Sequence, residues 1–371
     1  MNYKITMLPG DGIGPEVTAQ AKKALEAVAD IYDHHFEYKV ALMGAAAIDK
    51  TGNPLPEETL DACEASDTIL FGAIGDPKYD NDPSAKVRPE QGLLRLRKSL
   101  GLFCNIRPVK AYKELIDKSP LKQEIISGTD ISIYRELTGG IYFGEKHLSD
   151  DEQVASDGCK YSVEEIERIA HLAFKEAQRR RKKLTLVDKA NVLETSRLWR
   201  KTVTNLASQY PDVTLDFLFV DNAAMQLILN PKQFDVILTE NLFGDIISDE
   251  ASVIGGSIGL LASASVGKKY ALFEPIHGSF PQGAGKDIAN PLASILSAAM
   301  LLNHLGLQEE AEAVERAVEK SLELGITTAD INPEKPFSTS KVGDFIADYI
   351  LNQEDSNINF ANVHMGQSTI I

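Results

Sequence analysis

Two aspartates, Asp245 and Asp249, stand four residues apart in the segment 239–250. If this segment is helical, both carboxylates lie on one face of the helix, one turn apart. Two negative charges this close repel each other unless a positive group lies between them, and carboxylate oxygens suit Mg²⁺ or Mn²⁺. The alternative is two solvated acids on a helix surface. The apolar Ile246 and Ile247 favour a partly buried cleft with a divalent metal site, and Asp221, which ends a predicted strand, is a candidate third ligand.

Arginines form a second group whose residue type suggests chemistry. Arg97 falls on a predicted helix over 91–100, Arg107 ends the next predicted strand, and Arg135 stands just before a Thr-Gly-Gly turn. A guanidinium stays charged, and its fork of N–H donors matches a carboxylate. Each arginine alone could also be a surface residue. Because Leu93 and Leu94 share part of the helix face of Arg97, the pattern favours a substrate with carboxylates and a branched apolar group.

Two residues could transfer protons. Tyr142 follows the Thr-Gly-Gly turn, and Lys189 stands at the end of a predicted strand with apolar neighbours. Ligands gather at strand ends in open α/β sheets, and a lysine near carboxylates can be tuned into a proton-transfer group. An exposed lysine without a chemical role is the alternative interpretation of Lys189.

Two glycine-rich segments could approach a ligand. The segment 8–16 follows a predicted strand and opens a helix, but it lacks both the G-x-G-x-x-G fingerprint and the Gly-Lys-Ser/Thr ending of a phosphate loop. It is either a tight connection whose glycines take positive φ or a backbone that passes close to a ligand. The segment 273–291 is a glycine-rich loop that ends where a nearly all-apolar helix begins. A helix N-terminus behind such a loop predicts a cradle for a phosphate or a nucleotide.

The elements that must position these residues alternate between strands and helices. Strands are predicted over 3–8, 36–43, 68–73, 103–106, 184–187, 213–220 and 235–238, and helices over 15–32, 57–66, 91–100, 192–209, 221–229, 290–305, 308–324 and 341–351. Such alternation predicts an α/β fold with helices on both faces of a sheet. The segment 124–136 is predicted to be extended, and 138–160 to be a hairpin arm that could pair with another chain. Ser162 is predicted to cap a helix that ends in the basic run 179–183, which is expected to be a solvated helix end.

Composition limits the class of protein. The 371 residues predict two domains or one large interrupted domain. The net charge of −16 disfavours sequence-independent binding to nucleic acid or to an anionic membrane. No run of about 18 apolar residues predicts a membrane span, and the first residues lack the apolar core of a signal peptide. The three cysteines, Cys63, Cys104 and Cys159, fit neither a disulfide framework nor a zinc site, so a reducing cytoplasm is expected.

Six motifs together carry a specific resemblance. They are the segments 8–16, 88–97, 135–144, 187–191, 241–249 and 274–279. On these motifs the chain resembles the isocitrate/isopropylmalate dehydrogenase family of β-hydroxyacid oxidative decarboxylases, from about Lys4 to about Leu351. The resemblance implies an α/β two-domain fold with a central mixed sheet that is not a true Rossmann fold. Residues 1–103 and 258–353 would form a larger cofactor-side domain, 104–257 a smaller domain for dimerisation and metal and substrate binding, with the arm 138–160, and 354–371 a tail.

The same resemblance implies roles for individual residues. The expected carboxylate-binding arginines are Arg97, Arg107 and Arg135, and the expected ligands of Mg²⁺ or Mn²⁺ are Asp221, Asp245 and Asp249. Asp221 is also expected to bind the substrate. Tyr142 and Lys189 would transfer protons, and Lys189 would reach, with Asp221, into the partner's cleft of a homodimer with shared active sites. The residues expected to bind NAD are Gly75, Asp80, Arg88, His277, Gly278, Ser279, Gln282, Gly285 and Asn290.

Leu93, Leu94 and Val192 decide the expected substrate within that family. An isopropyl group fits these side chains, whereas the third carboxylate of isocitrate would be buried there without a partner, at a cost on the order of several kcal/mol. The expected reaction is oxidative decarboxylation of (2R,3S)-3-isopropylmalate to 4-methyl-2-oxopentanoate and CO₂ with reduction of NAD, as in leucine biosynthesis. The alternatives are a tartrate/malate or homoisocitrate dehydrogenase of the same family, a catalytically silent regulatory subunit, and a metal-dependent phosphotransferase.

The chain departs from the family pattern at two positions. Gln282 stands where the family usually has an aspartate that contacts the adenosine ribose and repels a 2′-phosphate. The NADP-using relatives have Lys and Tyr here, and Gln282-Gly283 offers neither, so NAD is still favoured. Asp76 replaces the usual second glycine before Pro77.

Overall fold

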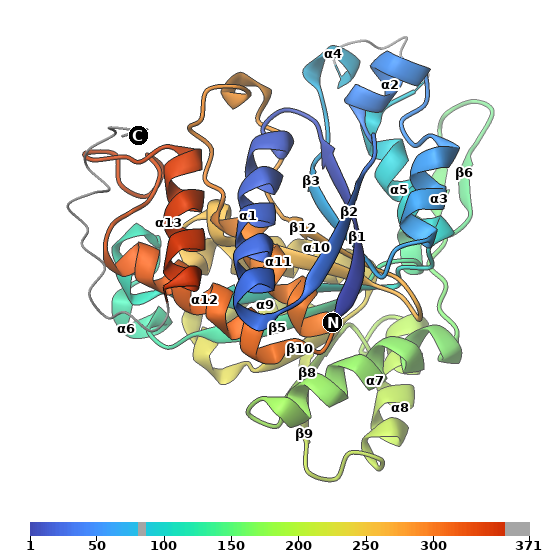
Figure 1. The fold of residues 1–371 in the computed structure, drawn as a ribbon. Helices are drawn as coiled ribbons and strands as arrows, with labels where there is room; N and C mark the ends of the chain where they lie inside the picture. Colours follow the sequence, from blue (N-terminus) through green and yellow to red (C-terminus); the bar gives the residue numbers. More distant parts are fainter. Residues whose placement is uncertain (81–86, 353–371) are drawn as a thin grey trace, which may run out of the picture.

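The computed structural model describes residues 1–80 and 87–352, so the expected tail 354–371 lies outside the described residues. A ten-stranded sheet runs through the molecule (Figure 1). Its order is β2 (His35–Val40), β1 (Asn2–Gly10), β3 (Thr68–Ala73), β12 (Ala271–Pro275), β11 (Ala262–Val266), β4 (Cys104–Lys110), β5 (Asp130–Glu136), β10 (Val236–Thr239), β8 (Lys183–Asp188) and β9 (Thr214–Phe219). Strand β11 is antiparallel to β12 and β4, and β4 is antiparallel to β5, whereas the other pairs are parallel. The predicted α/β fold with a mixed central sheet is confirmed.

Helices cover both faces of the first half of the sheet. On one face lie α1 (Gly14–Tyr32), α11 (Leu292–His304), α12 (Gln308–Glu323) and α13 (Thr339–Leu351), which pack together (Figure 1). On the other face lie α3 (Glu57–Glu64) and α5 (Pro89–Ser99). Neighbouring strand residues point to opposite faces, so Met7 packs with the first group and Leu8 with the second. Because both faces are buried, β3 is buried along its whole length and is mostly apolar, as parallel strands in α/β proteins usually are.

The second half of the sheet follows the same rule. Helices α7 (Val163–Arg179) and α8 (Glu194–Ala207) cover one face, and α9 (Val220–Leu229) and α10 (Asn241–Ser252) cover the other. Leu186 packs against α7 and α8, whereas its neighbour Val187 packs toward α9 and α10. Helix α10, which carries both aspartates, therefore lies on the sheet face that it shares with α9.

Short elements complete the fold. They are α2 (Ala45–Thr51), α4 (Pro77–Asp80), α6 (Gln123–Ile126), and the single-turn helices η1 (Lys113–Lys118), η2 (Gly140–Tyr142), η3 (Pro231–Gln233), η4 (Val253–Gly255), η5 (Ile258–Leu260) and η6 (Pro281–Gly283). The prediction of extended chain over 124–136 was wrong at its start, where α6 forms. Helix α2 and strand β12 were not predicted, because the groups that stabilise them are distant in sequence. β12, for example, pairs with β3 about 200 residues earlier.

The predicted arm is confirmed as a hairpin. Strands β6 (Lys146–Leu148) and β7 (Ala155–Asp157) form a separate two-stranded sheet whose residues are all exposed, and the arm projects from the body of the molecule (Figure 1). Its pairing with another chain stays a prediction. The predicted cap of the next helix is confirmed as well, because the Ser162 hydroxyl accepts the N–H of Glu165 at 3.3 Å and the Glu165 carboxylate accepts the N–H of Ser162 at 2.7 Å.

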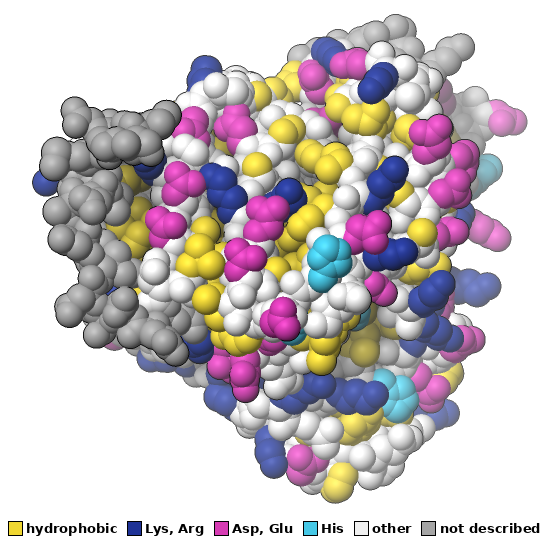
Figure 2. All heavy atoms as spheres, viewed as in Figure 1, with side chains coloured by type: hydrophobic (Ala, Val, Ile, Leu, Met, Phe, Trp, Pro, Cys, Tyr) yellow, Lys and Arg dark blue, Asp and Glu magenta, His cyan; other side chains and the backbone are white. Residues whose placement is uncertain are grey.

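The surface in Figure 2 shows acidic, basic and apolar side chains interspersed. Although the chain has a net charge of −16, the acidic side chains on this face do not form one patch. None of the helices that the structure describes combines the length and the apolar character that crossing a bilayer requires. The strands from residues 1–103 and 258–352 form one half of the sheet and those from 104–257 the other half. The division into two domains at these boundaries stays a prediction.

Candidate active site

Helix α10 lies directly on the side chain of Arg135. A Cβ atom on Gly244 would stand 2.5 Å from Cγ of Arg135, so only a glycine lets the helix approach this closely. Phe243, Gly244 and Asp245 are all part of this helix. Sheet register adds two neighbours: Asn105 on β4 lies opposite Arg135 on β5, and Arg107, two residues on, faces the same side.

The helix and the sheet bring opposite charges together. The carboxylate of Asp245 accepts hydrogen bonds from Nη1 of Arg135 and, at 2.8 Å, from the hydroxyl of Tyr142. Asp249, one turn on, accepts Nη1 of Arg107 at 2.6 Å. The structure therefore places five of the predicted site residues in one cluster.

Burial and charge set the protonation of this cluster. Burial lowers the pKa of Arg135, Asp245 raises it, and the neighbouring Arg107 and Arg97 lower it further, so the three guanidiniums lie within one electrostatic field. Burial, followed by the hydrogen bond to Asp245, raises the pKa of Tyr142 above its ordinary value. The phenol is therefore protonated at neutral pH and available as an acid.

Arg97 is held beside the cluster by a buried acid. Its Nη2 donates to Oε1 of Glu274 at 2.6 Å, while its buried Nε has no hydrogen-bond partner among the described residues. On the same helix, Leu94 has 57% of its surface exposed, whereas Leu93 is partly buried against the core. Of the two leucines, Leu94 is the one whose side chain is free to meet a substrate.

A second charged pair lies at the ends of β8 and β9. Nζ of Lys189 stands 2.6 Å from Oδ1 of Asp221, and this hydrogen bond lowers the pKa of Asp221. Val192, in the loop before α8, is 61% exposed. Across residues 1–80 and 87–352 no three His, Cys, Asp or Glu side chains come together as a metal site would require. Within one chain, Asp245 and Asp249 therefore lie close together, but Asp221 does not join them to form a group of three ligands.

Two loops expected to bind the cofactor lie side by side. A Cβ on Gly75 would stand 3.6 Å from Oγ of Ser279, and one on Gly12 would stand 2.0 Å from the carbonyl oxygen of Ser279. The glycines of segment 8–16 make room for the chain's own backbone. Gly10 and Gly12 also have φ of +71° and +58°, which glycine adopts without strain. This supports the interpretation of that segment as a tight connection.

Asp11, within that connection, fixes the loops. Its buried carboxylate accepts the N–H groups of Ala45, Ala46 and Gly75, each at 2.9 Å. Burial raises its pKa, and these backbone hydrogen bonds oppose the rise.

The loop 276–290 has both open and engaged residues. His277 has a buried Nε2 without a partner among the described residues, and burial lowers the pKa of its imidazole, which is therefore neutral at pH 7. Gly278 and Gly285 face open space, and Gln282 is exposed on η6. The amide of Asn290 is engaged within the chain: its Nδ2 donates to Asp330 at 3.0 Å, and its Oδ1 accepts the N–H that starts α11.

The segment 75–88 is described in part. Asp80 ends α4, and its side chain lies outside the described residues. Arg88 precedes α5, and its N–H donates to the side chain of Gln91 at 3.0 Å. The roles expected for these residues stay predictions.

The buried amides that orient the arginines were not predicted from the sequence. Asn241 accepts two N–H groups of Arg135. Asn105 accepts Nε of Arg107 at 2.9 Å, and the Ser248 hydroxyl accepts its Nη1 at 2.7 Å. The two-residue spacing of Asn105 and Arg107 on a strand was the available signal. Nothing local pointed to Asn241, because its partner is 106 residues away.

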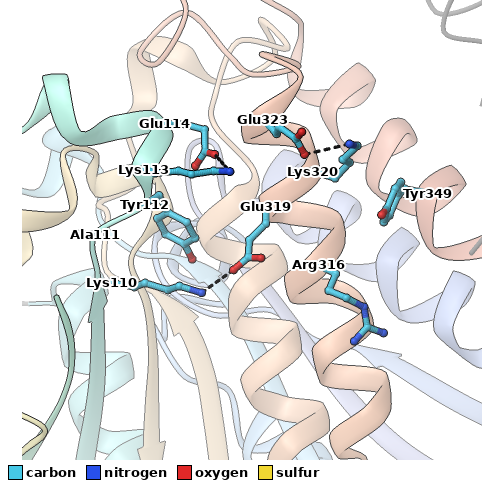
Figure 3. Close-up of a pocket in the computed structure, with 10 residues that line it drawn as sticks. All are labelled: Lys110, Ala111, Tyr112, Lys113, Glu114, Arg316, Glu319, Lys320, Glu323 and Tyr349. Atoms are coloured by element: carbon cyan, nitrogen blue, oxygen red, sulfur yellow. Dashed lines mark hydrogen bonds and ion pairs between the residues drawn. The ribbon is translucent and has the colours of Figure 1, made fainter. Parts of the chain in front are cut away.

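A hollow of about 460 Å³ between the β4–η1 segment and α12 contains none of the predicted site residues (Figure 3). Its lysines are paired within it: Lys110 with Glu319 at 2.6 Å, Lys113 with Glu114 at 3.4 Å and Lys320 with Glu323 at 3.0 Å. Because these charges neutralise one another, the hollow does not rival the arginine cluster as an anion site.

The arrangement of arginines, acids and glycine loops can be set beside known proteins. The model of the family described as isocitrate/isopropylmalate dehydrogenase matches residues 4–346. The chain belongs to the isocitrate/isopropylmalate dehydrogenase family. The resemblance found in the sequence motifs is therefore confirmed.

Relatives within the family are similar along nearly their whole length. A 3-isopropylmalate dehydrogenase of Bacteroides fragilis is 54% identical over 94% of this chain and 99% of its own. One of Wolinella succinogenes is 55% identical over 94% and 98%. Among solved structures, an isocitrate dehydrogenase from Methylococcus capsulatus is 36% identical with a TM-score of 0.82, over 94% of this chain and 99% of that one. A β-decarboxylating dehydrogenase from Thermococcus kodakarensis is 36% identical with a TM-score of 0.79, over 94% and 96%.

Proposed function

We propose that this chain oxidises and decarboxylates (2R,3S)-3-isopropylmalate to 4-methyl-2-oxopentanoate and CO₂, with reduction of NAD, as a step of leucine biosynthesis. The observation that supports this most is the cluster of three guanidiniums, together with the exposed Leu94, which stands one turn before Arg97 on the same helix, α5. Arginine forks suit the two carboxylates of this substrate, and the leucine suits its isopropyl group. Relatives named for this activity, at about 54% identity, support the assignment.

The arginines bind substrate by exchanging partners. In the structure Arg107 and Arg135 donate to Asp249 and Asp245. A substrate carboxylate offers these guanidiniums the same kind of acceptor and can accept two N–H groups from one arginine. Arg97 has an unpartnered Nε among the described residues, and this N–H is ready to bind a carboxylate.

Proton transfer falls to Tyr142 and Lys189. The protonated phenol of Tyr142 is the acid that delivers a proton to the carbon from which CO₂ leaves. Lys189, whose Nζ donates to Asp221 in the structure, takes the proton of the 2-hydroxyl only after its ammonium group has released a proton of its own. Two groups are assigned because the two protons are exchanged at different atoms, the 2-hydroxyl oxygen and the carbon that loses CO₂.

The acids fit a divalent cation. Asp245 and Asp249 present carboxylate oxygens one helical turn apart, and Asp221 of a second copy would complete the set. When bound, Mg²⁺ or Mn²⁺ acts as a Lewis acid on the substrate oxygens. The same acids accept hydrogen bonds from Arg135 and Arg107, and each carboxylate still has lone pairs that a cation could use.

The loops 74–76 and 276–290 fit a dinucleotide. Gly278 and Gly285 leave open space, and the partnerless Nε2 of His277 faces no acceptor or donor among the described residues. The expected cofactor residues are Gly75, Asp80, Arg88, His277, Gly278, Ser279, Gln282, Gly285 and Asn290. When bound, NAD supplies the hydride acceptor. The exposed Gln282 has no negative charge to repel a 2′-phosphate, so weak use of NADP is expected beside NAD.

The active unit is a homodimer in the cytoplasm. Helices α9 and α10 expose Met225, Leu229 and Ile246, which are 55%, 64% and 58% exposed. Apolar surface of this kind on adjacent helices favours a partner. Because Ile246 is next to Asp245, a second copy seated here would bring its own side chains to the cluster and could supply Lys189 and Asp221.

The deciding experiment compares substrates. Initial rates with 3-isopropylmalate, isocitrate, malate and tartrate are measured with Mg²⁺ and with NAD or NADP. Burial of three branched carbons contributes roughly 2 kcal/mol, so kcat/KM for 3-isopropylmalate should exceed that for malate at least about tenfold. Equal or better turnover of another acid would overturn the assignment, and no turnover of any would favour a regulatory subunit.

A variant pair tests the apolar contact. Leu94→Ala should reduce the preference for 3-isopropylmalate over malate about tenfold, because a shortened side chain no longer buries the isopropyl group. Leu324→Ala is the matched control, since Leu324 is also exposed but follows α12. An equal loss in both variants would show that Leu94 does not contact the substrate.

A further inference from the structure

Asn241 is a buried amide at the start of α10. Only 1% of its surface is exposed, and it stands just after the end of strand β10, at the strand ends where the site lies. No charge marks it. Its importance lies in the four hydrogen bonds that its side chain and its backbone N–H make.

Every polar group of the Asn241 side chain has a partner. Oδ1 accepts Nε of Arg135 at 3.2 Å and Nη2 at 2.9 Å. Nδ2 donates to the carbonyl oxygen of Gly139 at 3.2 Å, and the backbone N–H donates to the hydroxyl of Tyr161 at 3.0 Å. The amide orientation follows from these partners, because Oδ1 must face the cation and Nδ2 the carbonyl.

These bonds close a ring around the site. Asn241 holds two nitrogens of Arg135, which turns the third, Nη1, toward Asp245. From Asp245 the ring passes to the hydroxyl of Tyr142, which stands on η2 three residues after Gly139. The carbonyl of Gly139 returns to Asn241. One amide thus orients an arginine and the loop that carries the tyrosine.

We propose that Asn241 is a positioning residue that sets the geometry of both Arg135 and Tyr142. This rests on the proposed function, in which Arg135 binds a carboxylate and Tyr142 delivers a proton. An error of about 1 Å in the placement of a proton donor can lower a rate about a hundredfold, so the anchor at Gly139 acts on kcat. The bond to Arg135 acts on substrate binding.

Two asparagine-to-aspartate variants separate these effects. Asn241→Asp keeps an acceptor for Arg135 but replaces the donor to Gly139 with an oxygen that repels the carbonyl. Asn105→Asp is the matched control: Asn105 is equally buried and accepts Nε of Arg107, but it does not contact the Tyr142 loop. Both changes add a carboxylate beside a substrate arginine, and only the first releases Gly139.

The kinetic expectation is a split between kcat and KM. With 3-isopropylmalate, NAD and Mg²⁺, Asn241→Asp should lower kcat at least about tenfold, with a smaller rise in KM. Asn105→Asp should raise KM and change kcat by no more than about threefold. Equal losses of kcat in the two variants would overturn the proposal, because a general defect from a buried charge would then explain both.

A spectroscopic readout needs no turnover. The ¹³Cζ resonance of ring-labelled Tyr142, assigned by its loss in Tyr142→Phe, reports the hydrogen bond to Asp245. It should move toward the position of a solvated tyrosine in Asn241→Asp and in Asn241→Ser, a second variant in case the first does not fold. It should stay unchanged in Asn105→Asp. An unchanged resonance in both Asn241 variants would refute the positioning role even if the wild-type chain turned over a different acid.

Discussion

At the scale of single residues, the site consists of charges that hold one another. Arg107 pairs with Asp249, Arg135 with Asp245, and Arg97 with Glu274. A buried guanidinium without a partner costs several times more than a surface ion pair contributes, so the acids stabilise the arginines before any ligand binds. The two aspartates on α10 are both arginine partners and expected metal ligands, but they should contribute differently to the stability of the fold.

Asp245 and Asp249 should therefore differ in their effect on stability. Asp245 is 35% exposed and serves both Arg135 and Tyr142, so Asp245→Ala should lower the free energy of unfolding by about 1–3 kcal/mol. Asp249 is 68% exposed, and its partner Arg107 keeps Ser248 and Asn105, so Asp249→Ala should cost about 0–1 kcal/mol. Urea denaturation in the presence of a chelator measures both. Equal effects would contradict this ranking.

Glu240 is a buried acid that the proposed reaction does not use. It is 6% exposed, and burial, followed by the nearby Glu136 and Asp188, raises its pKa from 4.5 to about 7. The folded protein therefore holds this proton more tightly than the unfolded chain. The stability that this proton contributes is complete below about pH 4.5 and is lost as the pH rises through 7.

Glu240→Gln should remove that pH dependence. At pH 5 the variant and the wild-type chain should have similar free energies of unfolding, since glutamine resembles the protonated acid. At pH 8 the variant should be the more stable by about 1–3 kcal/mol, because it has no buried charge. Denaturation curves at half-unit pH steps give the difference, and a difference that does not grow with pH would show that Glu240 is ionised in the folded chain already at pH 5.

At the scale of elements, strand ends and helix starts bring the site together. Arg107 and Arg135 come from strands β4 and β5, and helix α10 begins where β10 ends. Asp11 plays the corresponding part for the loops, since it joins the segment after β1 to the start of α2 and to Gly75 after β3. Helix α2 is short, and this distant carboxylate supplies the acceptors that its first N–H groups need.

Asp11→Asn should loosen that junction. One carboxylate oxygen becomes an NH₂ group facing backbone N–H donors, so the free energy of unfolding should fall by about 1–3 kcal/mol. Asp61→Asn on the exposed side of α3 is the matched control and should change it by no more than about 0.5 kcal/mol. Urea denaturation at pH 7 measures both variants. A similar small effect at both positions would mean that Asp11 does not hold the loops.

At the scale of the whole molecule, one chain holds the proposed site in two pieces. The arginine cluster with Asp245 and Asp249 is one piece, and the pair Lys189 and Asp221 is the other. The described residues of a single chain do not combine the three aspartates into a metal site. A symmetric dimer that brings the second piece of one copy to the first piece of the other would complete two sites at once.

Mixed dimers test this arrangement. Lys189→Ala and Arg107→Ala should each abolish most activity in homodimers. In a heterodimer of the two, both lesions fall in one cleft and the other cleft is intact, so activity should recover to about half of the wild-type value per dimer. NADH production is followed after subunit exchange, with differential tags to count heterodimers. Heterodimers without recovered activity would mean that Lys189 acts in its own chain's cleft.

Local patterns in the sequence were sufficient for much of this protein. The four-residue spacing of Asp245 and Asp249 indicated a shared face if their segment were helical, and the structure shows that it is, as α10. The strand over 68–73 and the cap at Ser162 were also predicted, and the cap depends only on residues that are close in the sequence. The motifs also predicted the family, and the matched family model confirms it.

Contacts between distant residues were decided only by the tertiary structure. Packing places Asn241 on Arg135, 106 residues away, and register places Asn105 opposite Arg135. Asp11 likewise reaches α2 and Gly75 across 34 and 64 residues. A sequence read locally shows which residue types are present and which face of an element they share. Which distant polar groups become partners depends on close packing of whole elements, since only packing excludes water and obliges each buried donor and acceptor to find the other.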